Sequence, residues 1–425
     1  MNISELHQLF LKHPEISTDT RKISPDCLFF ALKGPNFNGN KFAREALEKG
    51  ASYAIIDEAG FEVSKNYILV DNVLETLQEL ATYHRNQSSA KIISLTGSNG
   101  KTTTKELIFN VLSKKYKSIA TQGNLNNHIG VPLTLLSIKN DTEMAVVEMG
   151  ANHQKEIAFL SSIAEPDFGY ITNFGKAHLE GFGGVEGVIK GKSELYDYLT
   201  SHDKYVFMNA DDPIQLKKLD SYVKKIGYSE SNSQYYQIQL IESNPFVKIE
   251  VEDTQILTQL TGAYNFTNCC AAIIIGKFFN VPLSDIKSAL EAYSPDNNRS
   301  QIIDKGRIKI ILDAYNANPT SMGMAIQNFN YMKASDSYLI LGDMFELGGA
   351  SKEEHQAITD LTQALGFTNV LLVGNHFYET QTSFLKFQTF EELRNHIESH
   401  PIQNGSILIK GSRGMALERI LEYIG

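Results

Sequence analysis

Short apolar runs alternate with longer stretches of helical spacing along most of the chain, and this pattern predicts an α/β protein. The clearest case begins at residues 91–95, an apolar run typical of a buried strand. Glu106–Leu112 follows with apolar residues at helical spacing. Between this strand and this helix lies the segment TGSNGKT, residues 96–102.

A glycine-rich turn between a strand and a helix is suited to hold phosphate, because backbone N–H groups and the helix N-terminus face the anion. Lys101 adds a positive charge, and the hydroxyl of Thr102 is a candidate Mg²⁺ ligand. Leu95 stands where the general pattern has its first glycine, so this is a shorter form of the loop. A simple connecting turn is the alternative. We predict an ATP site with the ligands Gly97, Ser98, Asn99, Gly100, Lys101, Thr102 and Thr103.

Residues 1–88 are predicted to form a small α/β domain ahead of this strand. Residues 27–32 and 53–56 have strand character, and residues 41–49 predict a short helix that ends at Gly50. The polar residues 87–90 are a plausible linker.

Residues 89–299 are predicted to form the ATP-binding domain. Apolar strands at residues 144–147, 168–173 and 205–208 run into polar residues, which is typical of a mostly parallel sheet with ligands at its carboxyl edge. Residues 233–259 alternate like two or three antiparallel strands. A helix is predicted over 261–279, where Asn265 and Asn268 either face a nucleotide or cap the helix.

Residues 300–425 are predicted to form a Rossmann-like domain. Four apolar strands at 308–312, 337–341, 370–373 and 407–409 alternate with helical stretches. Polar tips follow three of these strands and indicate a binding face. The expected fold is therefore a three-domain α/β chain with a central phosphate-loop domain.

The bulk composition and net charge of the chain exclude some classes of function. The 425 residues are 42% hydrophobic and 21% charged, and the formal net charge of −10 argues against nucleic-acid or anionic-membrane surfaces. Three cysteines are too few for a disulfide framework. We expect a soluble cytoplasmic protein, because there is neither a secretory signal nor a membrane-length apolar run.

Eight motifs together carry a resemblance to the Mur ligases. They are TGSNGKTTT, GNLNNHIGVPLTLL, VVEMGANHQKEI, AHLEGFG, GAYNFTN, DAYNANPTSM, LGDMFELG and KGSRG. The resemblance runs from Thr18 to Arg413, and GNLNNHIG, EMGANHQ and DAYNANP resemble the branch that adds D-alanyl-D-alanine to UDP-N-acetylmuramoyl-tripeptide.

The resemblance implies an ATP- and Mg²⁺-dependent amide ligase of peptidoglycan synthesis that works through an acyl phosphate. Its expected partners are UDP-MurNAc-tripeptide and D-Ala-D-Ala, with no nucleic acid, no membrane insertion and a monomeric state. The expected catalytic residues are Lys101, His178 and Lys192, and the expected metal ligands are Thr102, Glu148, His178 and a carbamylated Lys192. Lys190 competes with Lys192 for the carbamate role.

The resemblance also implies the remaining binding residues. Further nucleotide contacts are expected at Asn265, Asn268, Arg299, Asp313 and Asn316, and substrate contacts at Thr18, Asp19, Thr20, Arg21, Asn124, Asn126, Asn127, Tyr315, Asn318, Ser321 and Arg413. The sequence departs from the family pattern at Tyr264 and Asn40, where the family usually has His.

Three other interpretations remain open. A MurE-type ligase is expected to carry a DNPR-type signature in the third domain, where this chain has DAYNANP. A folylpolyglutamate synthase should lack the uridine-type segment at residues 18–21. A catalytically silent nucleotide-binding protein has no physical reason to keep all five of Lys101, Thr102, Glu148, His178 and Lys192.

Overall fold

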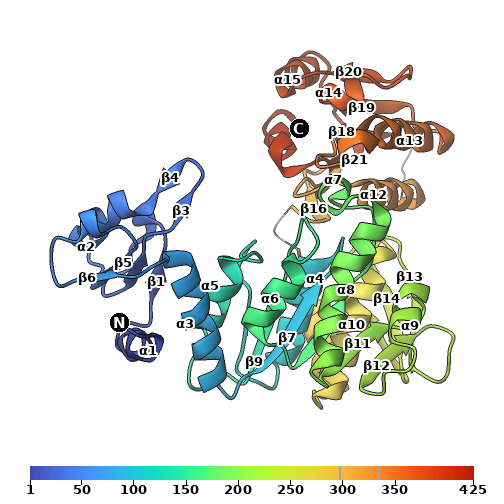
Figure 1. The fold of residues 1–425 in the computed structure, drawn as a ribbon. Coiled ribbons are helices and arrows are strands. Elements are labelled where there is room, and N and C mark those ends of the chain that lie inside the picture. The colour runs from blue at the N-terminus through green and yellow to red at the C-terminus, as the bar shows by residue number, and fades with distance from the viewer. Residues whose placement is uncertain (296–297, 333–335) are drawn as a thin grey trace.

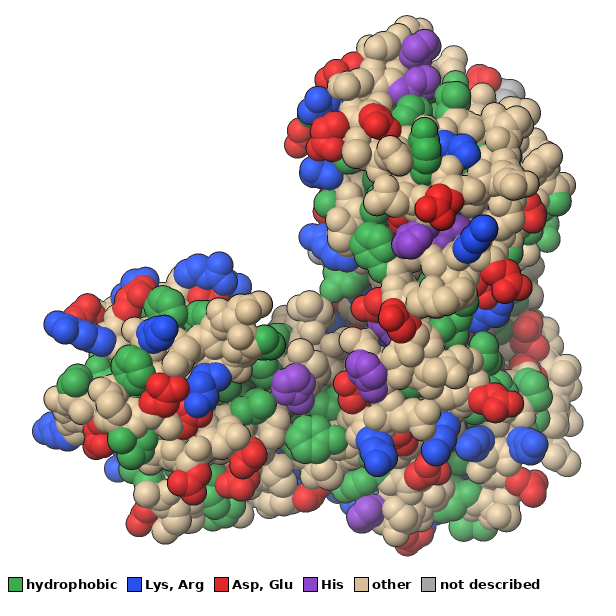
Figure 2. Space-filling view, turned by 45° about the horizontal axis from the view of Figure 1, so that its top comes forward, with side chains coloured by type: hydrophobic (Ala, Val, Ile, Leu, Met, Phe, Trp, Pro, Cys, Tyr) green, Lys and Arg blue, Asp and Glu red, His purple; other side chains and the backbone are tan. Residues whose placement is uncertain are grey.

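The computed structural model describes residues 1–295, 298–332 and 336–425, which form three α/β domains in chain order. The N-terminal and C-terminal domains both contact the central domain and diverge from it at an open angle (Figures 1 and 2). None of the helices in the described residues is long and apolar enough to cross a membrane. The predicted three-domain α/β fold is confirmed.

The N-terminal domain is built on a four-stranded parallel sheet of order β1-β2-β5-β6. Its elements are α1 (Ile3–Lys12), β1 (Ile16–Ser17), β2 (Leu28–Phe30), the hairpin strands β3 (Lys33–Gly34) and β4 (Phe37–Asn38), α2 (Ala43–Glu48), β5 (Tyr53–Ile56) and β6 (Tyr67–Leu69). The predicted strand at 53–56 is confirmed. The predicted helix at 41–49 is shorter, because residues 39–42 form a 3₁₀ turn before α2.

Helix α3 (Val73–Gln87) joins the N-terminal domain to the central one. Asn72 caps its start by accepting hydrogen bonds from the N–H groups of Leu74 and Glu75. Near its end, buried Arg85 donates to the carbonyl of Ala164 at 3.2 Å and to Asp167 Oδ2 at 2.9 Å. The helix is therefore anchored on the central domain by its last turn.

The central domain contains a nine-stranded sheet of order β15-β14-β13-β12-β11-β10-β7-β9-β8. Its strands are β7 (Lys91–Thr96), β8 (Ser118–Ala120), β9 (Met144–Glu148), β10 (Phe168–Ile171), β11 (Tyr205–Asn209), β12 (Lys225–Ser229), β13 (Tyr236–Glu242), β14 (Lys248–Val251) and β15 (Thr254–Leu257). The strands from β8 to β13 pair in parallel, and β13, β14 and β15 pair antiparallel, as predicted.

Helices cover both faces of this sheet (Figure 1). They are α4 (Lys101–Leu112), α5 (Gly130–Leu136), α6 (Glu156–Ala164), α7 (Leu179–Phe182), α8 (Val185–Ser201), α9 (Pro213–Lys218), α10 (Tyr264–Phe278) and α11 (Leu283–Ala292). Helix α10 is buried over most of its length and packs against α4, so it is a core helix.

The C-terminal domain has a six-stranded sheet of order β16-β17-β21-β18-β19-β20, parallel except for β16. Its elements are β16 (Gln301–Asp304), β17 (Ile308–Asp313), α12 (Pro319–Met332), β18 (Ser337–Gly342), α13 (Ser351–Ala364), β19 (Asn369–Val373), α14 (Asn375–Tyr378), β20 (Leu385–Phe387), α15 (Phe390–Ser399) and β21 (Gly405–Lys410). The four predicted strands are confirmed, and the two edge strands β16 and β20 are additional.

A buried histidine pair fastens α1 to α3. His7 and His84 are joined by a 3.0 Å hydrogen bond from Nε2 to Nδ1, and His84 Nε2 donates to the carbonyl of Ile138 in the central domain at 2.8 Å. Burial, and to a smaller extent the neighbouring His84, lowers the pKa of His7.

We predict that this pair makes stability fall in mild acid. Because the pKa of His7 is lower in the folded state, the unfolded chain binds more protons below about pH 6.5. The free energy of unfolding should therefore decrease as the pH falls through that value. Thermal melts between pH 7.5 and 5.5 should show a smaller loss for His7→Gln than for the parent chain. The same substitution at exposed His202 should leave the slope unchanged, and an equal change in both variants would contradict the assignment.

Candidate active site

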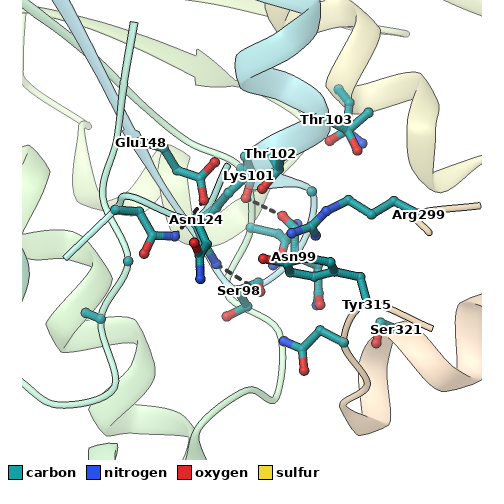
Figure 3. Close-up of a pocket in the computed structure, with 18 of the residues that line it drawn as sticks. Ser98, Asn99, Lys101, Thr102, Thr103, Asn124, Glu148, Arg299, Tyr315 and Ser321 are labelled. Carbon is teal, nitrogen blue, oxygen red and sulfur yellow. Dashed lines mark hydrogen bonds between the residues drawn. The ribbon is translucent and has the colours of Figure 1, made fainter. Parts of the chain in front are cut away.

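A cavity of about 850 Å³ lies between the central and C-terminal domains, at the carboxyl ends of their strands. Parallel pairing of β7 with β9 and β10 brings the ends of these three strands to one edge. The predicted residues that line the cavity are Ser98, Asn99, Gly100, Lys101, Thr102, Thr103, Asn124, Asn126, Asn127, Glu148, His178, Asn265, Asn268, Arg299, Asp313, Tyr315, Asn316 and Ser321 (Figure 3).

Two glycines with positive φ shape the turn between β7 and α4. Gly97 has φ +146°, and a Cβ there would lie 2.0 Å from Thr172 Oγ1. Gly100 has φ +77°, and a Cβ there would lie 2.5 Å from Asn268 Oδ1. The turn therefore packs closely against its neighbours, and the N-terminus of α4 points its free N–H groups toward the cavity.

Lys101 bends back over this turn. Its Nζ donates to the carbonyl of Gly97 at 2.7 Å, and burial lowers its pKa while Glu148 opposes that shift. The N–H groups of Ser98 and Asn99 donate to the carbonyl and side chain of Asn173. Anion binding at this turn consequently depends on Lys101 and the first turn of α4.

Glu148 is the buried carboxylate of the site. One oxygen accepts a hydrogen bond from Asn126 Nδ2 at 2.8 Å, and Oε2 is buried without a partner. Thr102, at the start of α4, contributes a buried hydroxyl to the same cavity. An unsatisfied carboxylate oxygen beside a hydroxyl suits a hard cation such as Mg²⁺. No group of three or more His, Cys, Asp or Glu side chains arranged for a metal occurs in the described residues.

His178 reaches the cavity from a left-handed backbone position, φ 52°. Its Nδ1 lies against a carboxylate oxygen of Glu346 from the C-terminal domain, and this contact lowers the pKa of Glu346. Sequence reasoning did not propose Glu346 as a site residue. Glu346 lies within the LGDMFELG motif, in the polar segment that follows β18.

Lys192 lies behind the cavity wall, on α8. It is 1% exposed, its Nζ donates to the carbonyl of Ala151 at 3.1 Å, and it lies 4.9 Å from the centroid of the Phe182 ring. Burial, reinforced by nearby Lys101, holds its pKa well below the ordinary value. Lys190 is exposed on the same helix.

The C-terminal wall contains an ion pair between buried Lys410 and part-buried Asp313 that sequence reasoning missed. Lys410, at the end of β21, contacts Asp313 Oδ2 at 2.6 Å and the carbonyl of Asn316 at 3.2 Å. Lys410 is the first residue of the KGSRG motif, from which only Arg413 was predicted as a site residue. The pairing of β17 with β21 places Asp313 directly beside Lys410.

Arg299 extends along Tyr315 towards the turn between β7 and α4 (Figure 3). This turn, residues 97–103, is called the phosphate turn below. Its guanidinium carbon lies 3.8 Å from the ring centroid, a cation–π contact. Its Nε is buried and has no hydrogen-bond partner. Arg299 therefore brings an unsatisfied donor and a positive charge to the cavity.

Asn265 and Asn268 bond to each other and to the phosphate-turn helix. Asn268 Nδ2 donates to Asn265 Oδ1 at 2.8 Å, and Asn268 Oδ1 accepts from Thr104 Oγ1 at 3.0 Å. Asn265 Nδ2 donates to the carbonyl of Thr261. Both side chains line the cavity, but most of their hydrogen-bonding groups already have protein partners.

The other predicted residues lie outside the cavity lining. Residues 18–21 are in the N-terminal domain, where Asp19 accepts hydrogen bonds from Arg21 that lower its pKa to about 2. Exposed Arg413 pairs with Glu418 at 2.7 Å. Gly97 and Asn318 lie just behind the lining, as does Lys192.

Matches to known families cover all three domains. Residues 14–85 match the Mur ligase family catalytic domain, residues 95–276 the Mur ligase middle domain, and residues 298–413 the glutamate ligase domain of Mur ligases. The chain is also 33% identical to the UDP-N-acetylmuramoyl-tripeptide–D-alanyl-D-alanine ligase of Bacillus subtilis, over 99% of this chain and 97% of that one. The Escherichia coli protein of the same name is 32% identical, over 96% and 93% of the two chains.

Solved structures of MurF proteins resemble this chain in fold as well as in sequence. MurF from Acinetobacter baumannii superposes with a TM-score of 0.85 at 31% identity, covering 96% of this chain and 92% of that one. MurF from Thermotoga maritima, solved in complex with ADP, gives 0.83 at 25% identity and covers 97% of both chains. The chain belongs to the Mur ligase family. Within the family, its similarity over nearly the whole length is to the MurF ligases.

We predict that the Lys410–Asp313 pair stabilises the C-terminal domain. Replacement by Met would leave the part-buried carboxylate of Asp313 without its charge partner, and removing one partner of such a contact costs about 1–3 kcal/mol. Urea unfolding of Lys410→Met should show this loss. Lys309→Met, at an exposed position of adjacent β17, is the matched control. Equal midpoints for the two variants would show that the ion pair is dispensable.

Proposed function

We propose that this protein is an ATP-dependent amide ligase that joins D-alanyl-D-alanine to UDP-N-acetylmuramoyl-tripeptide in peptidoglycan synthesis. The observation that carries the proposal is one cavity that faces a phosphate turn on one domain and Arg299, Asp313 and Lys410 on another. Full-length similarity to ligases of that name supports the same conclusion.

The proposed reaction has two steps. The γ-phosphoryl group passes from ATP to the carboxylate of the tripeptide, which gives ADP and an acyl phosphate. The amine of the dipeptide then attacks the acyl carbon, an amide forms, and inorganic phosphate and a proton leave. Lys101 and Arg299 would hold the phosphates and offset the charge of the two anions that must meet. The other proposed nucleotide contacts are the remaining residues of the turn at 97–103 and Asn265, Asn268, Asp313 and Asn316.

Mg²⁺ fits the residues present, because Glu148 offers an unpaired oxygen and Thr102 a hydroxyl. A cation bound there would neutralise part of the negative charge of the phosphates. His178 would contribute only after leaving Glu346. Lys192 is proposed as the site of a carbamate, because its burial favours the neutral amine that carbamylation requires.

The acceptor is proposed to span the open angle between the N-terminal domain and the cavity. Its uridine end would contact Thr18, Asp19, Thr20 and Arg21, and its sugar and phosphates would contact Asn124, Asn126 and Asn127. The residues proposed to approach the dipeptide are Tyr315, Asn318, Ser321 and Arg413. We further propose domain boundaries near residues 88 and 299, a monomeric state and a cytoplasmic location.

The decisive experiment is phosphate release with ATP, Mg²⁺ and both peptides. We expect release only when UDP-MurNAc-tripeptide and D-Ala-D-Ala are present together, with the joined product seen by mass spectrometry. Parallel mixtures contain single amino acids or a folate in place of the dipeptide. Release driven by a single amino acid would instead indicate another ligase of the superfamily, and no release in any mixture would indicate a silent nucleotide-binding protein.

We predict that Lys192→Ala lowers turnover strongly, by at least tenfold, and that a short carboxylic acid restores part of it. The added carboxylate would occupy the space of the proposed carbamate. Lys190→Ala is the matched control on the same helix, exposed and two residues away, and it should turn over normally. Full activity of Lys192→Ala would remove this lysine from the mechanism.

A further inference from the structure

Asn318 immediately precedes α12 and is held rigidly by the helix it caps. Its Oδ1 accepts from the N–H of Ser321 at 2.9 Å, and its own N–H donates to Ser321 Oγ at 3.1 Å. This reciprocal arrangement is that of a helix cap. The side-chain oxygen is therefore occupied, and Nδ2 is the group left to contact something else.

That group crosses the domain boundary. Asn318 Nδ2 donates to Asn99 Oδ1, in the phosphate turn, at 2.7 Å. Among the hydrogen bonds of the described ranges, this is the one that joins residues 97–103 to the C-terminal domain. Asn318 is 5% exposed, so solvent does not compete strongly for the contact.

The contact also decides which way the Asn99 amide points. Because Asn318 can only donate here, Asn99 must present its oxygen to it. Asn99 Nδ2 is then turned the other way, where it is buried and has no partner. Gly175 leaves room beside it, since a Cβ at that position would lie 2.8 Å from this nitrogen.

The backbone of Asn99 is fixed separately by the central domain. Its carbonyl accepts from Thr172 Oγ1 at 2.6 Å and from Asn173 Nδ2 at 3.0 Å, and its N–H donates to Asn173 Oδ1 at 3.1 Å. The two domains therefore divide the control of this residue. The central domain sets its main chain, and the C-terminal domain sets its side chain.

We infer that Asn318 is a positioning residue for the phosphate turn: it holds the Asn99 amide so that an unpaired donor remains within that turn. The turn then reaches full affinity for nucleotide phosphates only when the C-terminal domain is docked. This inference rests on the proposed binding of ATP at the turn and adds the residue through which the third domain acts on it.

The test uses Asn318→Ser in the full chain. Serine is as good a cap as asparagine and retains the acceptor for Ser321, but it has no amide to reach Asn99. We expect the dissociation constant of ATP, measured by calorimetry without peptide substrates, to rise about 2- to 13-fold, the range for loss of one net hydrogen bond. The melting temperature should stay close to that of the parent chain. If Asn318→Ser folds poorly, Asn318→Asp is the second variant, because aspartate also caps the helix.

Thr320→Val is the matched control. Thr320 Oγ1 accepts from the N–H of Lys176 at 2.9 Å, which is another bond between the two domains that does not touch the phosphate turn. We expect its ATP dissociation constant to stay within about twofold of the parent value. A twofold change corresponds to less than half the free energy of a typical net hydrogen bond. An equal weakening in both variants would mean that only docking matters, and it would overturn the role assigned to Asn318.

A double-mutant cycle with Asn99→Ala separates positioning from general structure. If Asn318 acts through Asn99, Asn318→Ser should cause no further loss of ATP affinity in the Asn99→Ala background. Additive losses would overturn the inference, as would an unchanged dissociation constant in Asn318→Ser. A parent chain that binds no ATP would instead refute the proposed function.

Discussion

Parallel pairing of β7 with β9 on one side and β10 on the other brings three chain segments to one edge of the central sheet. Thr96 leads into the phosphate turn, Glu148 ends its strand beside it, and Thr172 and Asn173 follow the third strand. In a parallel sheet the loops at the carboxyl ends collect on the same side, so residues far apart in sequence meet without special contacts. The two glycines of the turn then allow it to lie against Thr172 and Asn268, where any side chain would collide.

Charged side chains buried around this edge need partners or a function, because an isolated buried charge is strongly unfavourable. Lys410 has Asp313 at 2.6 Å. Lys192 has a carbonyl oxygen and a ring face but no carboxylate within ion-pair distance among the described residues. Glu148 retains an unpaired oxygen. Glu148 and Arg299 thus bring unsatisfied buried atoms to the cavity, where ligands would complete them.

Local patterns in the sequence were sufficient to predict part of the fold and part of the candidate site. Strands β7, β9 and β10 are mainly apolar and are buried on both faces, whereas edge strands β16 and β20 are short and half-exposed. Eighteen predicted residues line one cavity, although several were assigned by resemblance rather than by spacing. The contacts that were missed join remote segments: Lys410 lies 97 positions from Asp313, and Asn318 lies 219 positions from Asn99. Such partners are decided by how sheets and domains pack, and no local period encodes that.

Individual polar contacts join the C-terminal domain to the central one, in addition to buried apolar residues of both domains that belong to one cluster. Lys176 pairs with Glu354 at 2.5 Å, Thr320 accepts one backbone hydrogen bond, and Glu346 reaches His178. Partly exposed ion pairs of this kind contribute about 0–1 kcal/mol each, so small changes in charge can shift the balance between docked and undocked arrangements. Two of the interdomain contacts, at His178 and Asn99, use side chains that face the cavity. A phosphate or cation that competes for them therefore acts directly on the domain interface, without any longer path through the protein.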